Sequence, residues 1–154
     1  MKKLLSLLLI GFLVFGLASN AFAAPLSRAT FYLNQSYYLV NNSQQSMDAA
    51  PFIQNNRTYV PIRYLAYACG LTDQDVQWDK VFQTVKLSQG DKILQLQVGI
   101  DQAIINDFVY DLDVAPVVRD GRTFLPARFI AEAFGYKVTW DEQNRTVLIT
   151  PPKQ

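Results

Sequence analysis

The sequence contains one segment twice. Residues 50–70 read APFIQNNRTYVPIRYLAYACG and residues 115–135 read APVVRDGRTFLPARFIAEAFG, and they align without a gap from the first alanine to the last glycine. Upstream, the same alignment relates Asp48 to Asp113. A shared segment of this length indicates one supersecondary unit used twice, and this repeat limits the possible folds more than any single motif does.

Each copy predicts a strand, a helix and a helix cap in that order. In the second copy the turn signal Asp120-Gly121 precedes a short apolar run, and Pro126 then favours an extended residue before it and a helix that begins at the proline. A glycine closes the helix in a left-handed cap. The apolar helix stripes and their caps are Ala127, Ile130, Ala131, Phe134 and Gly135 in the second copy, and Ile62, Leu65, Ala66, Cys69 and Gly70 in the first.

The motif V-x-W-D follows each helix and leads through a polar turn into a strand that begins Thr-Val. The alternation of valine and tryptophan predicts that Trp78 and Trp140 belong to the core. Residues 84–87 and 93–98 flank a further turn signal, so we expect a hairpin between the copies, with apolar even positions in its second strand. Other short strands are predicted at residues 103–105, 108–110 and 117–118.

These elements predict an α+β fold with mostly antiparallel short strands and two short helices. No linker rich in Pro, Gly or Ser separates the copies. We therefore expect a single domain at residues 24–154, built from two pseudo-symmetric repeats at residues 29–88 and 94–150.

Residues 1–23 are predicted to be a signal peptide. Lys2 and Lys3 precede an apolar stretch at residues 4–18, which is short for a membrane span, and Ala21-Phe22-Ala23 supplies a cleavage signal. An uncleaved N-terminal anchor is the alternative. We expect a secreted protein, extracellular or associated with the cell wall, that has no membrane segment after cleavage.

Charge and cysteine content exclude several classes of function. Removal of residues 1–23 changes the formal net charge from +1 to −1, which gives no electrostatic footprint for nucleic acid. The only cysteine, Cys69, takes the place of Phe134 in the second copy, so we expect a buried apolar residue and not a nucleophile.

The string G-R-T-aromatic-apolar-P-x-R-aromatic-apolar-A-x-A-x-G, followed by V-x-W-D and Thr-Val, resembles the copper amine oxidase-like N-terminal domain, or stalk domain, of exported bacterial proteins. The resemblance covers roughly residues 29–150 and both copies. The first copy departs from it at Asn55-Asn56, where the family prefers a polar residue and then glycine. Asparagine tolerates left-handed backbone, so we expect the turn to survive.

In the enzyme that gave the family its name this domain lies away from the copper site, so the resemblance implies an accessory module without amine oxidase activity. The residue types agree. Copper sites of that class need imidazole ligands, and the chain has no histidine. We therefore predict no catalytic residues, no metal site and no cofactor.

Two repeated arginines are candidate ligand-binding residues. Arg63 and Arg128 each lie two residues after a helix-starting proline, where free backbone N–H groups could help to hold a carboxylate or phosphate. The alternative is a structural ion pair, most simply with the repeated Asp79 and Asp141. These aspartates could instead form the turns that they border.

Tyrosines supply the second candidate site. Tyr64 and Tyr67, with Tyr37 and Tyr38, enrich the first copy in aromatic residues that could stack on sugar rings. The alternative is half-buried packing on strands and short helices.

The leading hypothesis is a secreted, non-catalytic binding or scaffolding module of the cell envelope that contacts wall polymer or another exported protein. A carbohydrate-binding module for wall glycans is the second hypothesis. A hydrolase that uses carboxylates, such as Glu132, is the third. The sequence leaves the oligomeric state and the identity of the ligand open.

Overall fold

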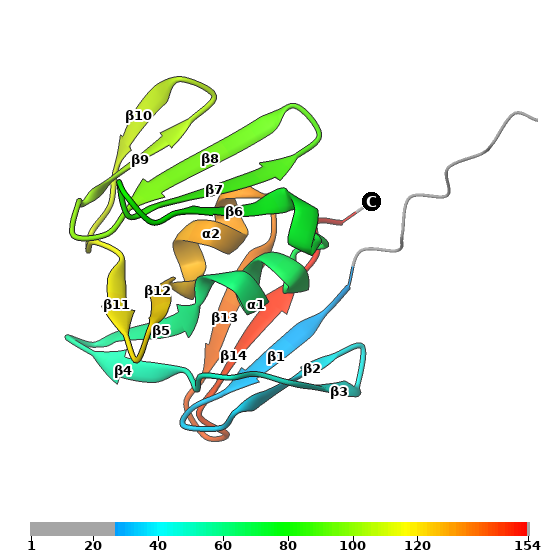
Figure 1. Cartoon of the computed structure of the whole chain (residues 1–154). Coiled ribbons are helices and arrows are strands. Elements are labelled where there is room, and N and C mark those ends of the chain that lie inside the picture. The colour runs from blue at the N-terminus through cyan, green and yellow to red at the C-terminus, as the bar shows by residue number, and fades with distance from the viewer. Residues whose placement is uncertain (1–26, 154) are drawn as a thin grey trace, which may run out of the picture.

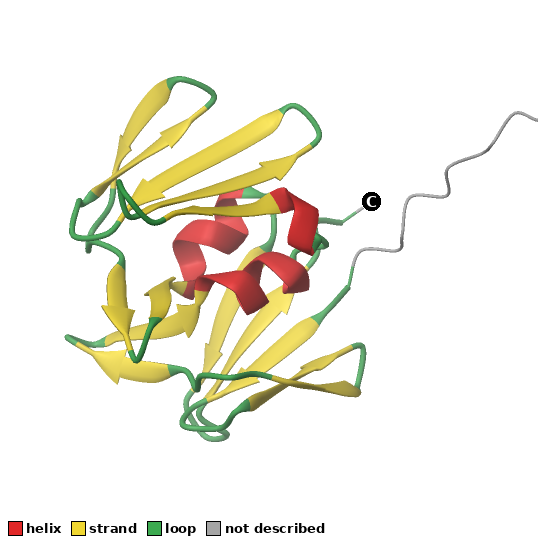
Figure 2. Cartoon of the chain, viewed as in Figure 1, coloured by secondary structure: helices red, strands yellow, loops and turns green. Residues whose placement is uncertain are grey.

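The computed structural model describes residues 27–153. The predicted signal peptide lies outside these residues. Two helices lie side by side at the centre, with one five-stranded sheet above them and another below in the view of Figure 1. A smaller four-stranded sheet closes one end, and Figure 2 shows that strands dominate. The α+β class with mostly antiparallel strands is confirmed.

The lower sheet joins strands from the two ends of the described chain. Its central pair is antiparallel, with Ala29 opposite Ile149 and Phe31 opposite Val147. The strands within residues 29–46 are not among those that the sequence patterns predict. In spatial order the strands are β13 (Lys137–Asp141), β14 (Thr146–Thr150), β1 (Ala29–Tyr32), β2 (Tyr37–Val40) and β3 (Ser43–Ser46).

The upper sheet contains the predicted hairpin between the copies. In its second strand the apolar even positions Leu94 and Leu96 are buried, as the alternation requires. In spatial order the strands are β10 (Phe108–Asp111), β9 (Gln102–Ile105), β8 (Lys92–Gln97), β7 (Thr84–Gln89) and β6 (Val76–Asp79).

The four-stranded sheet consists of two hairpins paired at their second strands. Asp120 and Gly121 have φ of 50° and 72°, and Asn55 and Asn56 have 50° and 57°, so both predicted turns form with left-handed backbone. The departure at Asn55-Asn56 therefore leaves the turn intact. In spatial order the strands are β11 (Val117–Arg119), β12 (Arg122–Pro126), β5 (Arg57–Pro61) and β4 (Phe52–Gln54).

Each helix is shorter than expected at its N-terminal end. α1 (Ile62–Ala68) and α2 (Ala127–Ala133) begin one residue after their prolines, which end the preceding strands with ψ of 123° and 127°. The expectation that the proline is the first helical residue is wrong, because the proline is still paired in the sheet. The loop after α1 also contains a short 3₁₀ turn, η1 (Asp73–Asp75), which has no counterpart after α2.

Both helices end in the predicted glycine cap. Gly70 and Gly135 have φ of +83°. Gly70 N donates to the carbonyl of Tyr67 at 2.9 Å and Leu71 N to that of Ala66 at 3.1 Å, and the second copy repeats this pair of bonds at Gly135 and Tyr136. This is the Schellman motif, which satisfies carbonyls that a helix end leaves free.

The main core contains residues of both copies. The apolar stripes of both helices are buried as predicted, and they pack with Leu87 and Leu94 of the upper sheet and Phe31 and Ile149 of the lower sheet. A second, smaller cluster of Phe52, Tyr59 and Phe124 involves the four-stranded sheet.

The prediction that Trp78 and Trp140 belong to the core is wrong. Their side chains are 45% and 39% exposed. Each lies near the end of its strand, next to a turn, and α2 spans about 10 Å at ~1.5 Å per residue. A helix of that length covers Val138, which packs against the core, and leaves the end of β13 open.

No helix among residues 27–153 is both long and apolar enough to cross a membrane. The domain boundaries and the internal pseudo-symmetry stay predictions.

Candidate functional site

An open groove of about 860 Å³ lies between α2, the end of β13 and the hairpin of β4 and β5. The loop after β10 forms its remaining wall. Its lining contains both charged and apolar side chains. The lining residues that carry its chemistry are Arg57, Asp113, Arg128, Glu132, Trp140 and Arg145.

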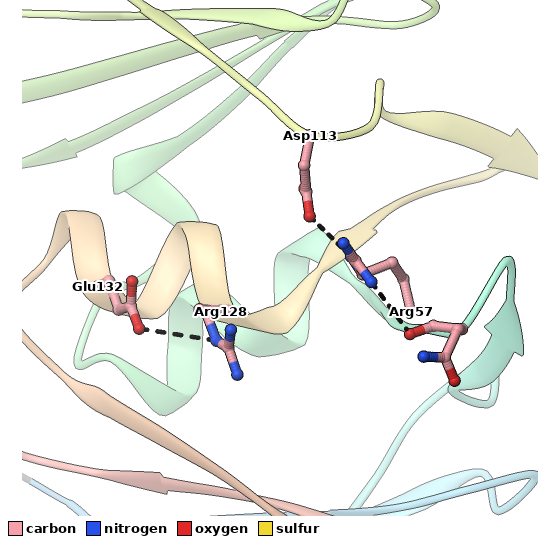
Figure 3. Close-up of polar contacts among 5 residues, drawn as sticks. Arg57, Asp113, Arg128 and Glu132 are labelled. Carbon is pink, nitrogen blue, oxygen red and sulfur yellow. Dashed lines mark hydrogen bonds and ion pairs between the residues drawn. The ribbon is translucent and has the colours of Figure 1, made fainter.

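Two ion pairs stand in the groove wall. Arg57, the first residue of β5, donates from Nε to Asp113 Oδ2 at 2.7 Å and from Nη1 to the carbonyl oxygen of Asn56 at 3.4 Å. Arg128 and Glu132 are separated by one turn of α2, and Arg128 Nε lies 3.8 Å from Glu132 Oε1 (Figure 3). The side chains of Arg57 and Arg128 are 45% and 74% exposed, so both guanidinium groups retain free donors for a ligand.

Aromatic surface completes the groove. Trp140 is partly exposed, Phe129 is half-buried on α2, and Ile53 is exposed on β4. The lining contains three arginines and four carboxylates, so charge of both signs is present. Such a surface suits a polar ligand with donors and acceptors distributed along it better than a simple anion.

The predicted ion pairs of the repeated arginines do not form. Arg63 has no carboxylate within 4.0 Å among residues 27–153, and Arg128 pairs with Glu132 instead of Asp141. Asp79 accepts the backbone N–H groups of Val81 and Phe82, at 2.8 and 3.0 Å. Asp141 likewise accepts the backbone N–H of Asn144, at 3.0 Å. The turn-forming role weighed for these aspartates is confirmed.

A different pair of arginines joins the two copies. Arg122 donates from Nε to Asp48 Oδ2 at 2.6 Å, its Nη2 lies 2.5 Å from the same oxygen in the ion pair, and Arg57 makes the corresponding bond from Nε to Asp113. The hydrogen bond from Arg122 holds the pKa of Asp48 below its usual value. Sequence reasoning missed both pairs, although the arginine and the aspartate each recur at equivalent places in the two copies.

Tyr64 and Tyr67 lie outside the groove and pack against each other, with ring centroids 6.0 Å apart. The Tyr64 hydroxyl accepts the backbone N–H of Asp48 at 3.1 Å, and the Tyr67 hydroxyl donates to the carboxylate of Asp73. Burial, followed by this carboxylate, raises the pKa of Tyr67 to about 12. Both side chains are half-buried, so the structure supports the packing interpretation of these tyrosines.

The two copies differ at this point. Tyr64 and Tyr67 occupy in α1 the positions that Phe129 and Glu132 occupy in α2. The second pair lines the groove, and the first pair lies outside it. Of the four predicted ligand-binding residues, Arg128 is therefore the only one in the groove, and the sequence reading placed Trp140 in the core instead.

Cys69 is fully buried, and burial raises the pKa of its thiol to about 12. A thiol in that state is protonated at neutral pH and unreactive. The prediction that Cys69 is a buried apolar residue is confirmed.

The chain's donor set does not fit a copper site with imidazole ligands, since the sequence has no histidine. Across residues 27–153, no group of three or more Cys, Asp or Glu side chains is arranged to hold a metal ion.

A search of curated proteins found no match to the chain. The family model described as the copper amine oxidase N-terminal domain matches residues 29–149, which include every strand but the last residue of β14. That domain is a non-catalytic module of the oxidase. The match spans most of the sequence and contains both copies of the repeated segment, and the chain therefore belongs to the copper amine oxidase N-terminal domain family.

Proposed function

We propose that this protein is a non-catalytic binding module of the bacterial cell envelope, and that its groove holds a glycan chain of the wall. The observation that carries the proposal is the open groove in which a partly exposed Trp140 stands among ion-paired arginines and carboxylates.

The groove offers what a sugar ring needs. An indole face can pack against the apolar C–H face of a pyranose, as aromatic rings do with other flat apolar surfaces. The free N–H groups of Arg57 and Arg128 and the carboxylate oxygens of Asp113 and Glu132 can bond to hydroxyl, amide or carboxylate groups of the ligand. The candidate tyrosines Tyr64 and Tyr67 already bond to neighbouring residues of the chain.

A binding role fits the groove better than hydrolysis. Asp113 and Glu132 each face an arginine, at 2.7 and 3.8 Å. An acid–base pair of a hydrolase needs one carboxyl group held neutral beside another. Here each of the two carboxylates is paired with an arginine instead.

We place the protein outside the cytoplasm. The support is the sequence of residues 1–23, in which two lysines precede an apolar stretch and a small-residue cleavage signal. Wall polymer would then be accessible to the groove.

We further infer that the scaffold has internal pseudo-twofold symmetry with exchanged strands. The pairing of β1 with β14 corresponds to that of β8 with β7, because Ala29 faces Ile149 as Leu94 faces Leu87. Asn41 accepts the backbone N–H of Arg28 at 3.0 Å, and Asn106 accepts that of Ile93 at 2.7 Å.

The two crossed ion pairs support the same inference. Arg57 bonds to Asp113 and Arg122 bonds to Asp48, so that each copy supplies the arginine for the aspartate of the other. This arrangement would hold the groove wall in place through contacts with both copies.

Co-sedimentation with purified cell wall tests the proposed function. The purified protein should pellet with the wall, and soluble wall glycan fragments should release it. Trp140→Ala should abolish binding, whereas the matched control Trp78→Ala should bind as wild type does, because Trp78 is also exposed at the corresponding place in the first copy but lies outside this groove. Equal binding by both variants, with both melting normally, would refute the groove as the site.

A further inference from the structure

β10 is an apolar strand with an open edge. It pairs only with β9 and ends the upper sheet (Figure 1). Phe108, Val109 and Tyr110 are 70%, 60% and 48% exposed, and Ile104 opposite Val109 is 40% exposed. Alternate backbone N–H and C=O groups of an edge strand point away from its neighbour, so β10 offers both hydrogen-bonding groups and apolar side chains.

The corresponding edge of the lower sheet is different. β3 holds the same place relative to β2 that β10 holds relative to β9, and it consists of Ser43, Gln44, Gln45 and Ser46. These residues offer an added strand no large apolar side chains to pack against, unlike those of β10. The chain therefore shows that a polar sequence can form this strand, and that the apolar sequence of β10 is not required for it to form.

Charge favours one occupant for the open edge. The hairpin of residues 101–111 contains Asp101, Asp107 and Asp111 and no basic residue, whereas residues 36–46 carry no charge. If β10 paired with a second copy of itself in the register that aligns the apolar residues, each Asp107 would face an Asp111 of the other copy. Like charges directly opposite each other destabilise a strand pair, so the edge suits a different chain with basic residues.

From these features we propose that β10 is a docking edge for an extended segment of another exported protein, one with alternating β-branched or aromatic residues flanked by lysine or arginine. The segment adds a sixth strand to the upper sheet, its apolar side chains lie against Phe108, Val109 and Tyr110, and its basic ends face Asp107 and Asp111. This inference rests on the proposed role as a binding module, but its apolar residues Phe108, Val109 and Tyr110 lie outside the groove, and the two surfaces share Asp111 alone among the residues of β10.

Titration by NMR tests the proposal with a defined probe. The acetylated and amidated peptide Lys-Thr-Val-Thr-Val-Lys is added to the purified ¹⁵N-labelled protein, and a peptide with glutamate in place of both lysines is the control. The lysine peptide should shift the amide signals of residues 108–111 most strongly, and it should bind roughly tenfold or more tightly than the glutamate peptide at low salt.

Two variants locate the site. Phe108→Ser combined with Val109→Gln and Tyr110→Gln gives β10 the polar residues of β3 and should abolish the shifts while the other signals stay native. Val81→Ser combined with Phe82→Gln removes two exposed apolar residues from another hairpin and should leave the titration unchanged.

Other results would overturn the proposal. These are equal binding of both peptides, shifts centred outside β10, or shifts of residues 108–111 that depend on protein concentration without peptide, which would make the occupant a second copy. Wall binding through Trp140 is measured in a separate experiment. If the peptide does not bind β10, the proposed function is therefore not refuted. If Trp140→Ala still binds the wall, the peptide result is not refuted either.

Discussion

Replacing Gly135 with alanine tests the caps that position both helices. Gly135 has φ of +83°, and a Cβ added there would meet no atom within 4 Å, so the cost of Gly135→Ala comes from the backbone alone. Left-handed backbone costs an alanine about 1–2 kcal/mol, and the stiffer unfolded chain offsets roughly 0.4–1 kcal/mol of this. At the midpoints of these two ranges the net loss is about 0.8 kcal/mol, which should lower the melting temperature by about 3 °C.

Gly70→Ala is the equivalent substitution in the first copy. Its φ is also +83°, and its Cβ would lie 3.7 Å from the Tyr136 hydroxyl and 3.8 Å from Gln89 Nε2, which are ordinary contact distances. Circular dichroism melts should therefore show similar losses for both variants, and a smaller loss for Gly135→Asn, because asparagine tolerates left-handed backbone. An alanine variant that melts at or above the wild-type temperature would refute the Schellman cap as the reason for glycine.

Three further predictions concern Arg128, Cys69 and the ion pair of Asp48. Arg128→Ala should change the melting temperature by no more than about 2 °C, because an exposed pair with Glu132 contributes at most about 0.5 kcal/mol, and a drop above about 4 °C would contradict this. Ellman's reagent should leave Cys69 unmodified in the folded protein near neutral pH and react with it after denaturation, since burial raises the pKa of the thiol. Because the folded pKa of Asp48 is lowered, the stabilisation by Arg122 is present above the carboxyl's ordinary pKa of 3.8 and is lost as pH falls through the folded value. The stability difference between wild type and Arg122→Ala should accordingly be visible at neutral pH and disappear in acid, and a difference that persists in strong acid would exclude this cause.

Local chemistry made the helices and turns predictable. Pro126, the apolar stripe through Ile130 and the closing Gly135 each act on the backbone within a few residues, so their effect can be read from the sequence. The pairing of β1 with β14 could not be predicted in this way, since no local rule links Ala29 to Ile149.

Most of the groove could not be predicted from the sequence either, because it also depends on contacts between residues far apart in the chain. The alternation of Val138 and Trp140 shows which face of β13 they share, but whether that face is covered depends on the length and position of α2. Likewise, Arg57 and Asp113 are separated by 56 positions, and only the fold brings them together. The internal repeat was the available signal for the crossed ion pairs, because both partners occur once in each copy.

β1 lies inside its sheet, between β14 and β2, so its two neighbours come from opposite ends of the described chain. The hairpin of β1 and β2 can form early, but the ladder between β1 and β14 closes almost the whole chain into a loop, and such non-local pairing slows folding. During synthesis, the strand that emerges first must therefore wait for the last one before its sheet is complete. A chain shortened by removal of β14 would lose an interior strand, and β1 would be left as an exposed edge.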